Sequence, residues 1–177
     1  VNKIYAGIGS RETPKDVLSA FEAIGLYLAK MNFTLRSGHA DGADSAFESG
    51  CDFAFGKKEI YLPWYGFNGS MSRFNRVPEK AFEMAGKYYS HWDKFKIGTQ
   101  KLLARDCQQV LGNNLDDPVD FIICYTKDGK LLGGTSMAIR VANDQNIKVI
   151  NAGSYNSVDD FKKDLYLFIK KNYSISA

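Results

Sequence analysis

Residues 3–16 read KIYAGIGSRETPKD, an apolar run that ends in a glycine-rich bend and passes directly into a helix start. The run Lys3–Ile8 does not alternate cleanly between apolar and polar residues, which is typical of a strand covered on both faces. After the bend, Thr13 is a suitable N-cap, Pro14 fits the first helical position and Asp16 completes a capping box. A buried strand, a bend of small residues and a helix form the first unit of a parallel α/β sheet.

The same alternation of strand and helix continues along the chain. An apolar stripe at helical spacing follows the first bend, and we interpret it as core: Val17, Phe21, Ile24, Leu28 and Met31. The further elements expected are strands at 33–36, 59–62, 119–125 and 148–151, and helices from about 42, over 136–145 and after a cap at Ser157 and Asp160. This order predicts an α/β fold, a single Rossmann-like, doubly wound, mainly parallel sheet of about five strands with helices on both faces.

An aromatic-rich insert over about 64–115 interrupts this order, with helices expected from about residue 78 and over 99–111. Its rings could stack a nucleobase, or they could form core or a subunit interface. The aromatic residues in question are Trp64, Tyr65, Phe67, Phe74, Tyr88, Tyr89 and Trp92. The aromatic content predicts a homo-oligomer. Because the chain has no repeats, low-complexity tracts or linker, residues 1–177 are predicted to form one domain.

The composition is that of an ordinary globular protein, with 45% hydrophobic and 24% charged residues and a net charge of +3. Such a mixed surface does not by itself predict a nucleic-acid partner. The three cysteines and two histidines show no metal-ligand spacing, so neither a metal site nor a disulfide framework is expected. No other cofactor is predicted. No leader and no apolar run of transmembrane length is visible, which predicts a cytoplasmic protein without a membrane partner.

Three loops rich in small residues follow predicted strands: 7–11, 37–44 and 133–136. In an open parallel sheet such loops meet at one edge, where ligands bind, and each precedes a helix N-terminus that favours anions. The predicted ligand-binding residues are Gly7, Gly9, Ser10, Arg11, Ser37, Gly38, Asp41, Gly42, Arg105, Gly133, Gly134, Thr135 and Ser136. Arg11 offers a fork suited to phosphate. Arg105 is the insert arginine expected to point into the crevice, the alternative being an ion pair with Asp106 or Asp116.

Two common nucleotide motifs are incomplete or absent. GIGSRE is not a full G-x-G-x-x-G, because Glu12 occupies the position of the last glycine. No G-x-x-x-x-G-K-[ST] occurs, which disfavours ATP hydrolysis of the P-loop type. The loops therefore predict a site for the phosphate or ribose of a ligand, without assigning that ligand to a standard nucleotide class.

Three segments together resemble the SLOG superfamily of Rossmann-like proteins: GIGSR, SGHADGADSAFESG and GGTSMAIRVANDQNIKVIN. That superfamily includes the DprA DNA-processing proteins, the LOG phosphoribohydrolases and molybdenum-cofactor carriers. The DprA pattern S-G-x-A-x-G-x-D-x-x-A falls on Ser37, Gly38, Ala40, Gly42 and Asp44, with Phe47 in place of the last alanine. The stretch KLLARDCQQVLGNNLDDPVDFIICYTKDG is similar to the middle of a DprA-like subgroup found in phages and mobile elements.

The resemblance also bears on catalysis. The LOG motif P-G-G-x-G-T-x-x-E, aligned on Gly134 and Thr135, places Ala138 where its glutamate would stand. An alanine can neither move a proton nor stabilise a developing cation, so an enzyme of this type is not favoured. If the protein is an enzyme, Glu12 and Asp44 are the catalytic candidates.

The main functional prediction is the binding of a nucleotide-derived small molecule, such as an ADP-ribose-type or cyclic nucleotide signal. For a phage-encoded protein the resemblance implies the sequestration of a defence signal in the host cytoplasm. Two alternatives stay open. One is a nucleotide-processing enzyme that hydrolyses an N-glycosidic or phosphate bond. The other is a DprA-like protein that binds single-stranded DNA, which the modest net charge makes less favoured.

Overall fold

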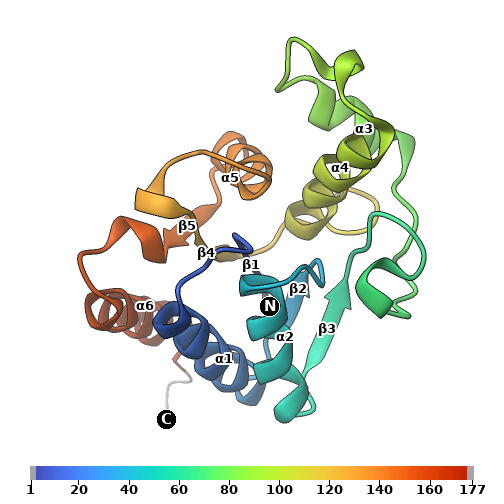
Figure 1. Ribbon diagram of the computed structural model, residues 1–177. Helices are drawn as coiled ribbons and strands as arrows, with labels where there is room; N and C mark the ends of the chain where they lie inside the picture. Colours follow the sequence, from blue (N-terminus) through green and yellow to red (C-terminus); the bar gives the residue numbers. More distant parts are fainter. Residues whose placement is uncertain (1–2, 175–177) are drawn as a thin grey trace.

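The computed structural model describes residues 3–174, which contain one five-stranded sheet (Figure 1). The strands are β1 (Ile4–Gly9), β2 (Thr34–Ser37), β3 (Lys57–Ile60), β4 (Phe121–Tyr125) and β5 (Lys148–Asn151). Their order across the sheet is β3-β2-β1-β4-β5, and every neighbouring pair is parallel. The predicted α/β fold with about five parallel strands is therefore confirmed.

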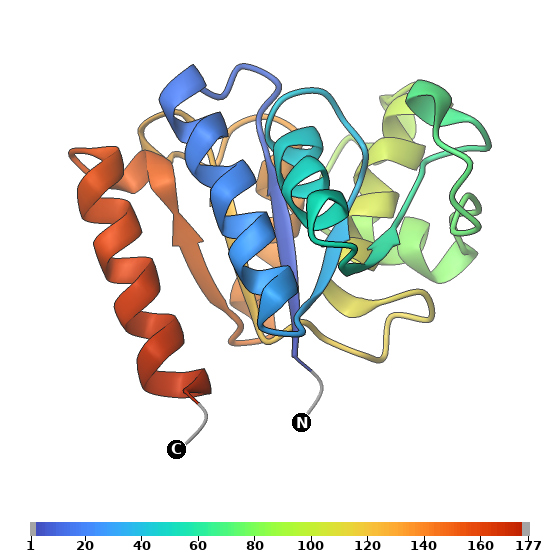
Figure 2. The ribbon, with the colours of Figure 1, turned by 90° about the horizontal axis from the view of Figure 1, so that it is seen from below.

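Helices cover both faces of the sheet (Figures 1 and 2). Those described are α1 (Lys15–Lys30), α2 (Ala43–Phe53), α3 (Glu79–Gly86), α4 (Ile97–Leu111), α5 (Thr135–Asp144) and α6 (Val158–Tyr173). The helices α1, α2 and α6 pack on one face, where Figure 2 shows them in front of the sheet. The helices α4 and α5 pack on the other face, and α3 lies against α4. The insert thus forms part of the second helical layer.

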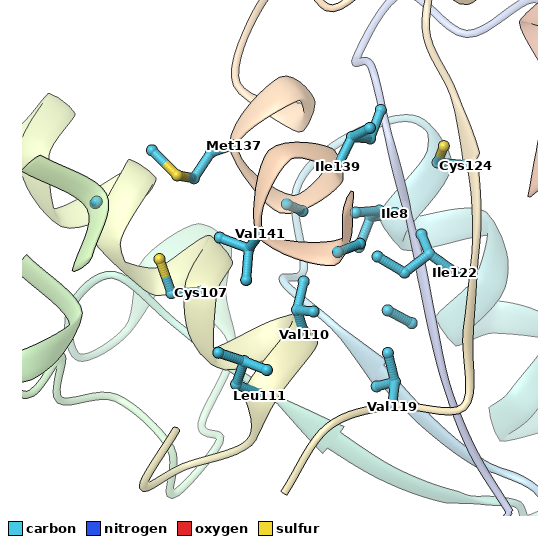
Figure 3. Packing of buried hydrophobic residues seen from close by; sticks show 14 of the residues in the cluster. Ile8, Cys107, Val110, Leu111, Val119, Ile122, Cys124, Met137, Ile139 and Val141 are labelled. Carbon is cyan, nitrogen blue, oxygen red and sulfur yellow. The ribbon is translucent and has the colours of Figure 1, made fainter. Parts of the chain in front are cut away.

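Each face has its own hydrophobic core. The core under α4 and α5 is aliphatic, and Figure 3 shows Ile8 and Ile122 of the sheet facing Val110 and Val141 of these helices. The core under α1, α2 and α6 is rich in aromatic rings, such as the Phe21–Phe47 pair with ring centroids 4.3 Å apart. The apolar stripe expected after the first bend contributes Val17, Phe21, Ile24 and Leu28 to this second core.

The three cysteines are free and buried, one in each of three structural layers. Cys51 lies in α2, Cys107 in α4 and Cys124 in β4 between the two helical layers. Burial raises the pKa of the Cys51 thiol to about 11 and those of Cys107 and Cys124 to about 12. All three are therefore thiols rather than thiolates near neutral pH.

The start of α1 differs from the prediction. Thr13 does not cap the helix, because its Oγ1 donates to the carbonyl of Ser10 (2.6 Å) and so closes the turn that follows β1. The cap position belongs to Pro14, which has no side chain that could accept a hydrogen bond. The predicted capping box is wrong here, whereas the cap at α6 is confirmed: Ser157 accepts from the backbone N–H of Asp160 (3.1 Å).

The third strand also lies two residues earlier than expected. It pairs with β2 in a register that sets Glu59 opposite Arg36 and Ile60 opposite Ser37, where β2 ends. The following Tyr61 and Leu62 are buried, but Leu62 donates to the carbonyl of Phe74 (2.8 Å) in the insert. Tyr61 and Leu62 were included in the predicted strand because they are apolar and buried. A periodicity argument does not show where the neighbouring strand, β2, ends.

Within residues 3–174, no helix is both long enough and apolar enough to cross a membrane. The strand order places β1 at the middle of the sheet, with β2 on one side and β4 on the other. The connections that leave β1 and β4 therefore run in different directions, which opens a crevice beyond the carboxyl ends of these two strands.

Candidate functional site

A cleft of about 720 Å³ lies at this crevice. Parts of all three loops expected to meet there contribute to its lining, together with α4 and the segment before it. The lining residues are Ile8, Gly9, Ser10, Arg11, Glu12, Ala40, Asp44, Tyr89, Phe95, Thr99, Leu102, Leu103, Arg105, Asp106, Gln109, Leu131, Leu132, Gly133, Gly134, Thr135, Ser136 and Arg140. A volume of this size is typical of a site for a nucleotide-sized group.

The carboxylate of Asp44, in the first turn of α2, connects two of the loops. Its Oδ1 accepts from the backbone N–H of Gly9 (3.2 Å), and its Oδ2 accepts from those of Gly38 (3.2 Å) and Ala40 (3.4 Å). Burial raises the pKa of this carboxyl to about 6, while Arg105 and the backbone donors lower it. Asp44 thus holds the ends of β1 and β2 in place, and both of its oxygens are engaged in doing so.

Arg105 lines the cleft as expected but is only 4% exposed. Its Nη1 donates to the carbonyls of Gly38 (2.7 Å) and Tyr61 (2.9 Å), and its Nε donates to Asp106 Oδ1 (3.0 Å). Arg105 therefore connects α4 with the segments that follow β2 and β3. The ion pair with Asp106, considered from the sequence as an alternative, is also present.

Four buried polar residues form what we call the floor of the cleft: Asp44, Arg105, Asp106 and Gln109. Burial raises the pKa of the Asp106 carboxyl to about 7; the negative charge of Asp44 adds to the shift, while Arg105 opposes it. Two carboxyl groups whose pKa values lie close to neutrality are thus placed beside one arginine. Such a floor does not favour an anion.

Basic and aromatic side chains line other parts of the cleft. Arg11 is exposed in the loop after β1, and Arg140 projects from α5. The Arg140 Nε is enclosed, and among residues 3–174 it has no hydrogen-bond partner. The rings of Tyr89 and Phe95 are half-buried and meet edge to face, with centroids 5.2 Å apart. Arginine and aromatic side chains together are suited to phosphates and bases, respectively.

The loop before α5 brings backbone close to the cleft. Gly133 has a φ of +74°, a conformation that favours glycine. Gly134 has an ordinary φ of −62°, and a Cβ added there would meet no atom within 4 Å. Nothing inside the described chain requires a glycine at 134, whereas a group bound in the cleft could approach its backbone closely. The Ser136 hydroxyl donates to the carbonyl of Gly133 (2.6 Å).

Five of the predicted ligand-binding residues do not line the cleft: Gly7, Ser37, Gly38, Asp41 and Gly42. Gly7 is in contact with Phe47, whose Cγ would lie 2.5 Å from an added Cβ, so this glycine serves helix packing. The Ser37 hydroxyl donates to the carbonyl of Gly7 (2.6 Å) inside the sheet. Gly38 lies behind the floor, Asp41 is exposed, and Gly42 packs against the loop that follows β1.

The sequence did not identify four of the lining residues that carry chemistry: Phe95, Asp106, Gln109 and Arg140. A usable signal existed for two of them. The helical stretch LLARDCQQVL places charged and amide side chains among apolar ones on every face. In a helix that is buried all round, polar residues must find partners or face a cavity. Nothing comparable marks Arg140 or Phe95.

Comparisons with known proteins identify the fold. No family model matches the chain, and no curated protein matches it in sequence. Among solved structures, it is similar to DNA processing protein A of Helicobacter pylori, described for its single-stranded DNA binding mode. That match has 14% identity and a TM-score of 0.60, over 98% of this chain and 83% of the other. It is also similar to DNA processing protein A (DprA) of Streptococcus pneumoniae, with 17% identity and a TM-score of 0.55. Here 96% of this chain matches, but only 56% of the other protein.

These matches confirm a DprA-like, Rossmann-type α/β fold, and they correct the functional prediction. The main prediction was a protein that binds a nucleotide-derived small molecule and sequesters a signal. The similar structures are DNA-processing proteins, and one is described for its binding to single-stranded DNA. The findings thus favour the alternative that was ranked lower. The subgroup of phage proteins and the homo-oligomer stay predictions.

Proposed function

We propose that this chain binds single-stranded DNA in the cleft. The observation that carries the proposal is the lining itself, which combines two rings, Tyr89 and Phe95, with two arginines, Arg11 and Arg140. Bases of a single strand are free to stack on aromatic side chains, whereas those of a duplex are not. The similarity in fold to a protein described for single-stranded DNA binding supports the same assignment.

The arrangement of charge agrees with this proposal. The positive groups lie on the loop after β1 and on α5, and the N-terminus of α5 with Gly134 adds backbone N–H groups. Phosphates of a strand would bind there, and a base would extend toward the rings. The net charge of +3 is small, which predicts a short contact with few phosphates rather than a long basic track.

The direct test is a fluorescence anisotropy titration with a labelled oligonucleotide of about twelve nucleotides, single-stranded and as a duplex, at about 50 mM salt. We expect the single strand to bind more tightly than the duplex of the same sequence. Absence of single-strand binding under these conditions would overturn the proposal.

Substitutions would locate the binding site. Arg11→Ala should weaken binding roughly tenfold, because a charge-assisted contact to phosphate is lost, and Arg11→Lys should restore only part of it. Arg140→Gln should have a comparable effect. Arg76→Ala is the matched control, since Arg76 is an exposed arginine outside the cleft lining. Unchanged affinity in a folded Arg11→Ala, Arg140→Gln double variant would place the binding site elsewhere.

A further inference from the structure

One atom at the floor of the cleft is available to a ligand. Asp106 is 8% exposed, and its Oδ1 accepts from Arg105 Nε (3.0 Å). With the Gln109 amide turned so that its nitrogen faces Asp106, that nitrogen also donates to Oδ1 (3.3 Å), while the Gln109 oxygen accepts from Gly38 N–H (3.0 Å). Among residues 3–174, Asp106 Oδ2 has no hydrogen-bond partner. Unlike Arg140 Nε, which also has none, it is not fully enclosed by protein atoms. It therefore faces the open cleft.

Asp44 differs from Asp106 in this respect. Both Asp44 oxygens accept hydrogen bonds from backbone N–H groups, so they offer nothing further to a ligand. The two carboxyl groups together nevertheless repel a phosphate from the floor. A part of the strand that occupies this position should therefore be uncharged. Of the two uncharged parts of a DNA strand, deoxyribose and base, only the base carries N–H donors for a carboxylate.

We infer that Asp106 Oδ2 accepts a hydrogen bond from the exocyclic amino group of a nucleobase, so that the cleft prefers a base with such a group over thymine or uracil. This inference rests on the proposed binding of single-stranded DNA. An ionised carboxylate only accepts hydrogen bonds, and the amino group at C4 of cytosine is a donor that it recognises well. Uracil and thymine present a carbonyl oxygen at that position, which would face the carboxylate with no proton between them.

The matched probes are short homopolymers of deoxycytidine and deoxyuridine, because the two bases have the same size and differ only along the edge that carries this group, at C4 and at N3. The measurement belongs at about pH 8, where the Asp106 carboxyl is ionised. We expect the cytosine strand to bind about tenfold more tightly than the uracil strand.

Asp106→Asn tests the atom directly. The amide oxygen of Asn can still accept from Arg105, which turns the amide NH2 toward the cleft as a donor. The preference for cytosine should then disappear or reverse in favour of uracil. Asp159→Asn is the charge-matched control, since it removes an exposed carboxylate on α6 outside the cleft lining. It should keep the wild-type preference.

A second measurement needs no substitution and covers the case in which Asp106→Asn fails to fold. The charged groups that act on Asp106 are Arg105 on its own helix and Asp44 on α2, and burial is the main cause of its raised pKa. Lowering the pH from about 8 to about 6 protonates Asp106 and gives it a donor. The cytosine preference of the wild-type protein should therefore shrink.

The outcomes distinguish this inference from the proposed binding of single-stranded DNA on which it rests. Equal binding of the two strands by the wild-type protein would overturn the inference and leave DNA binding standing. A preference that survives in folded Asp106→Asn would also overturn it, because another group would then read the base. If neither strand binds at low salt, the proposed function fails and the inference fails with it.

Discussion

At Asp44, one carboxylate accepts hydrogen bonds from backbone groups of two different loops. Asp44→Asn keeps the size of the side chain but turns one acceptor into a donor, which would face an N–H group. A buried N–H left without a partner costs about 1–3 kcal/mol. We expect the free energy of unfolding, measured in urea, to fall by about that amount.

The neighbouring Asp41 provides the control for this measurement. It lies two residues before the start of α2 and is exposed, so Asp41→Asn should leave stability unchanged. Equal stability of the Asp44→Asn protein and the wild type would mean that the three hydrogen bonds contribute nothing net to the folded state.

The Asp106 carboxyl should make stability depend on pH. Its pKa is raised from 3.8 to about 7, mainly by burial, so the folded state holds this proton more tightly than the unfolded chain does. The stability that this group contributes is complete below about pH 3.8 and is lost as the pH rises through about 7. In Asp106→Asn this loss of stability should be absent. The Asp44 carboxyl, whose pKa is raised to about 6, should still cause a smaller loss of the same kind.

Thermal unfolding at about pH 5 and about pH 8 checks this prediction. The difference in Tm between the two pH values should be smaller in Asp106→Asn than in the wild type. Asp159→Asn, in which an exposed carboxylate is removed, should behave as the wild type does. An unchanged difference in Asp106→Asn would show that the buried carboxyl titrates alike in the folded and unfolded states.

For single residues, the sequence predicted where a residue lies in the fold better than which groups its side chain contacts. The loops that carry Gly9, Arg11 and Thr135 were recognised because small residues after strands follow a known topological rule. Arg140 was missed because its place in the cleft depends on how α5 packs, and no local pattern encodes it. Asp106 was missed although the polar residues of its buried helix offered a signal. The hydroxyl of Thr13 was misassigned for a local reason: it donates to the Ser10 carbonyl in the turn after β1, so it does not cap α1.

At the scale of elements, α1 and α2 approach each other closely at two glycines. A Cβ on Gly50 would lie 2.0 Å from the carbonyl oxygen of Glu22, and one on Gly25 would lie 2.5 Å from that of Phe47. Gly50→Ala should therefore push the helices apart and destabilise the protein by about 1–3 kcal/mol.

Gly98, in the first turn of α4, makes a matched control because a Cβ there would meet no atom within 4 Å. Gly98→Ala should be neutral or stabilise the protein by up to about 1 kcal/mol, since alanine favours the helix. Urea unfolding of the two variants compares them directly. A Gly50→Ala protein as stable as Gly98→Ala would contradict the close packing of α1 and α2.

Most element boundaries could be predicted to within two residues, because β1 and β4 are apolar runs and the helices have regular apolar stripes. The last strand, 148–151, agrees fully with β5. The shift of β3 has a physical cause: Tyr61 and Leu62 are as buried as strand residues, but β2 ends at Ser37. Tyr61 N–H still donates to the Ser37 carbonyl (2.9 Å), whereas Leu62 N–H donates to Phe74 of the insert (2.8 Å). The local sequence indicates that a residue is buried, but it does not indicate which segment of the chain that residue pairs with.

For the whole molecule, the charge distribution predicts a weak dependence of DNA binding on salt. If Arg11 and Arg140 contact one phosphate each, the plot of log affinity against log salt has a slope of about −1.4 for single strands. Between about 50 and about 200 mM salt the affinity should then fall about sevenfold. Anisotropy titrations at several salt concentrations measure the slope. A much steeper slope would show that phosphates are also bound outside the cleft.

The function of the whole molecule was the least predictable level. Glycine-rich loops before helix N-termini suit any phosphate group, so they do not distinguish a free nucleotide from a strand. The net charge of +3 argued against nucleic acid, but it averages over the surface and says nothing about Arg11 and Arg140 in one cleft. The distinction depends on side chains that the fold brings together.

The reactivity of the three buried thiols can be used to detect local opening of the structure. Cys51, Cys107 and Cys124 are free, and as buried thiols with raised pKa values they cannot react with an alkylating reagent while their layers stay closed. Each becomes reactive only when its own part of the molecule opens. Mass spectrometry of alkylated peptides would therefore time the opening of α2, α4 and β4 separately. A cysteine introduced at the mouth of the cleft could also carry a fluorophore without background labelling of the native protein.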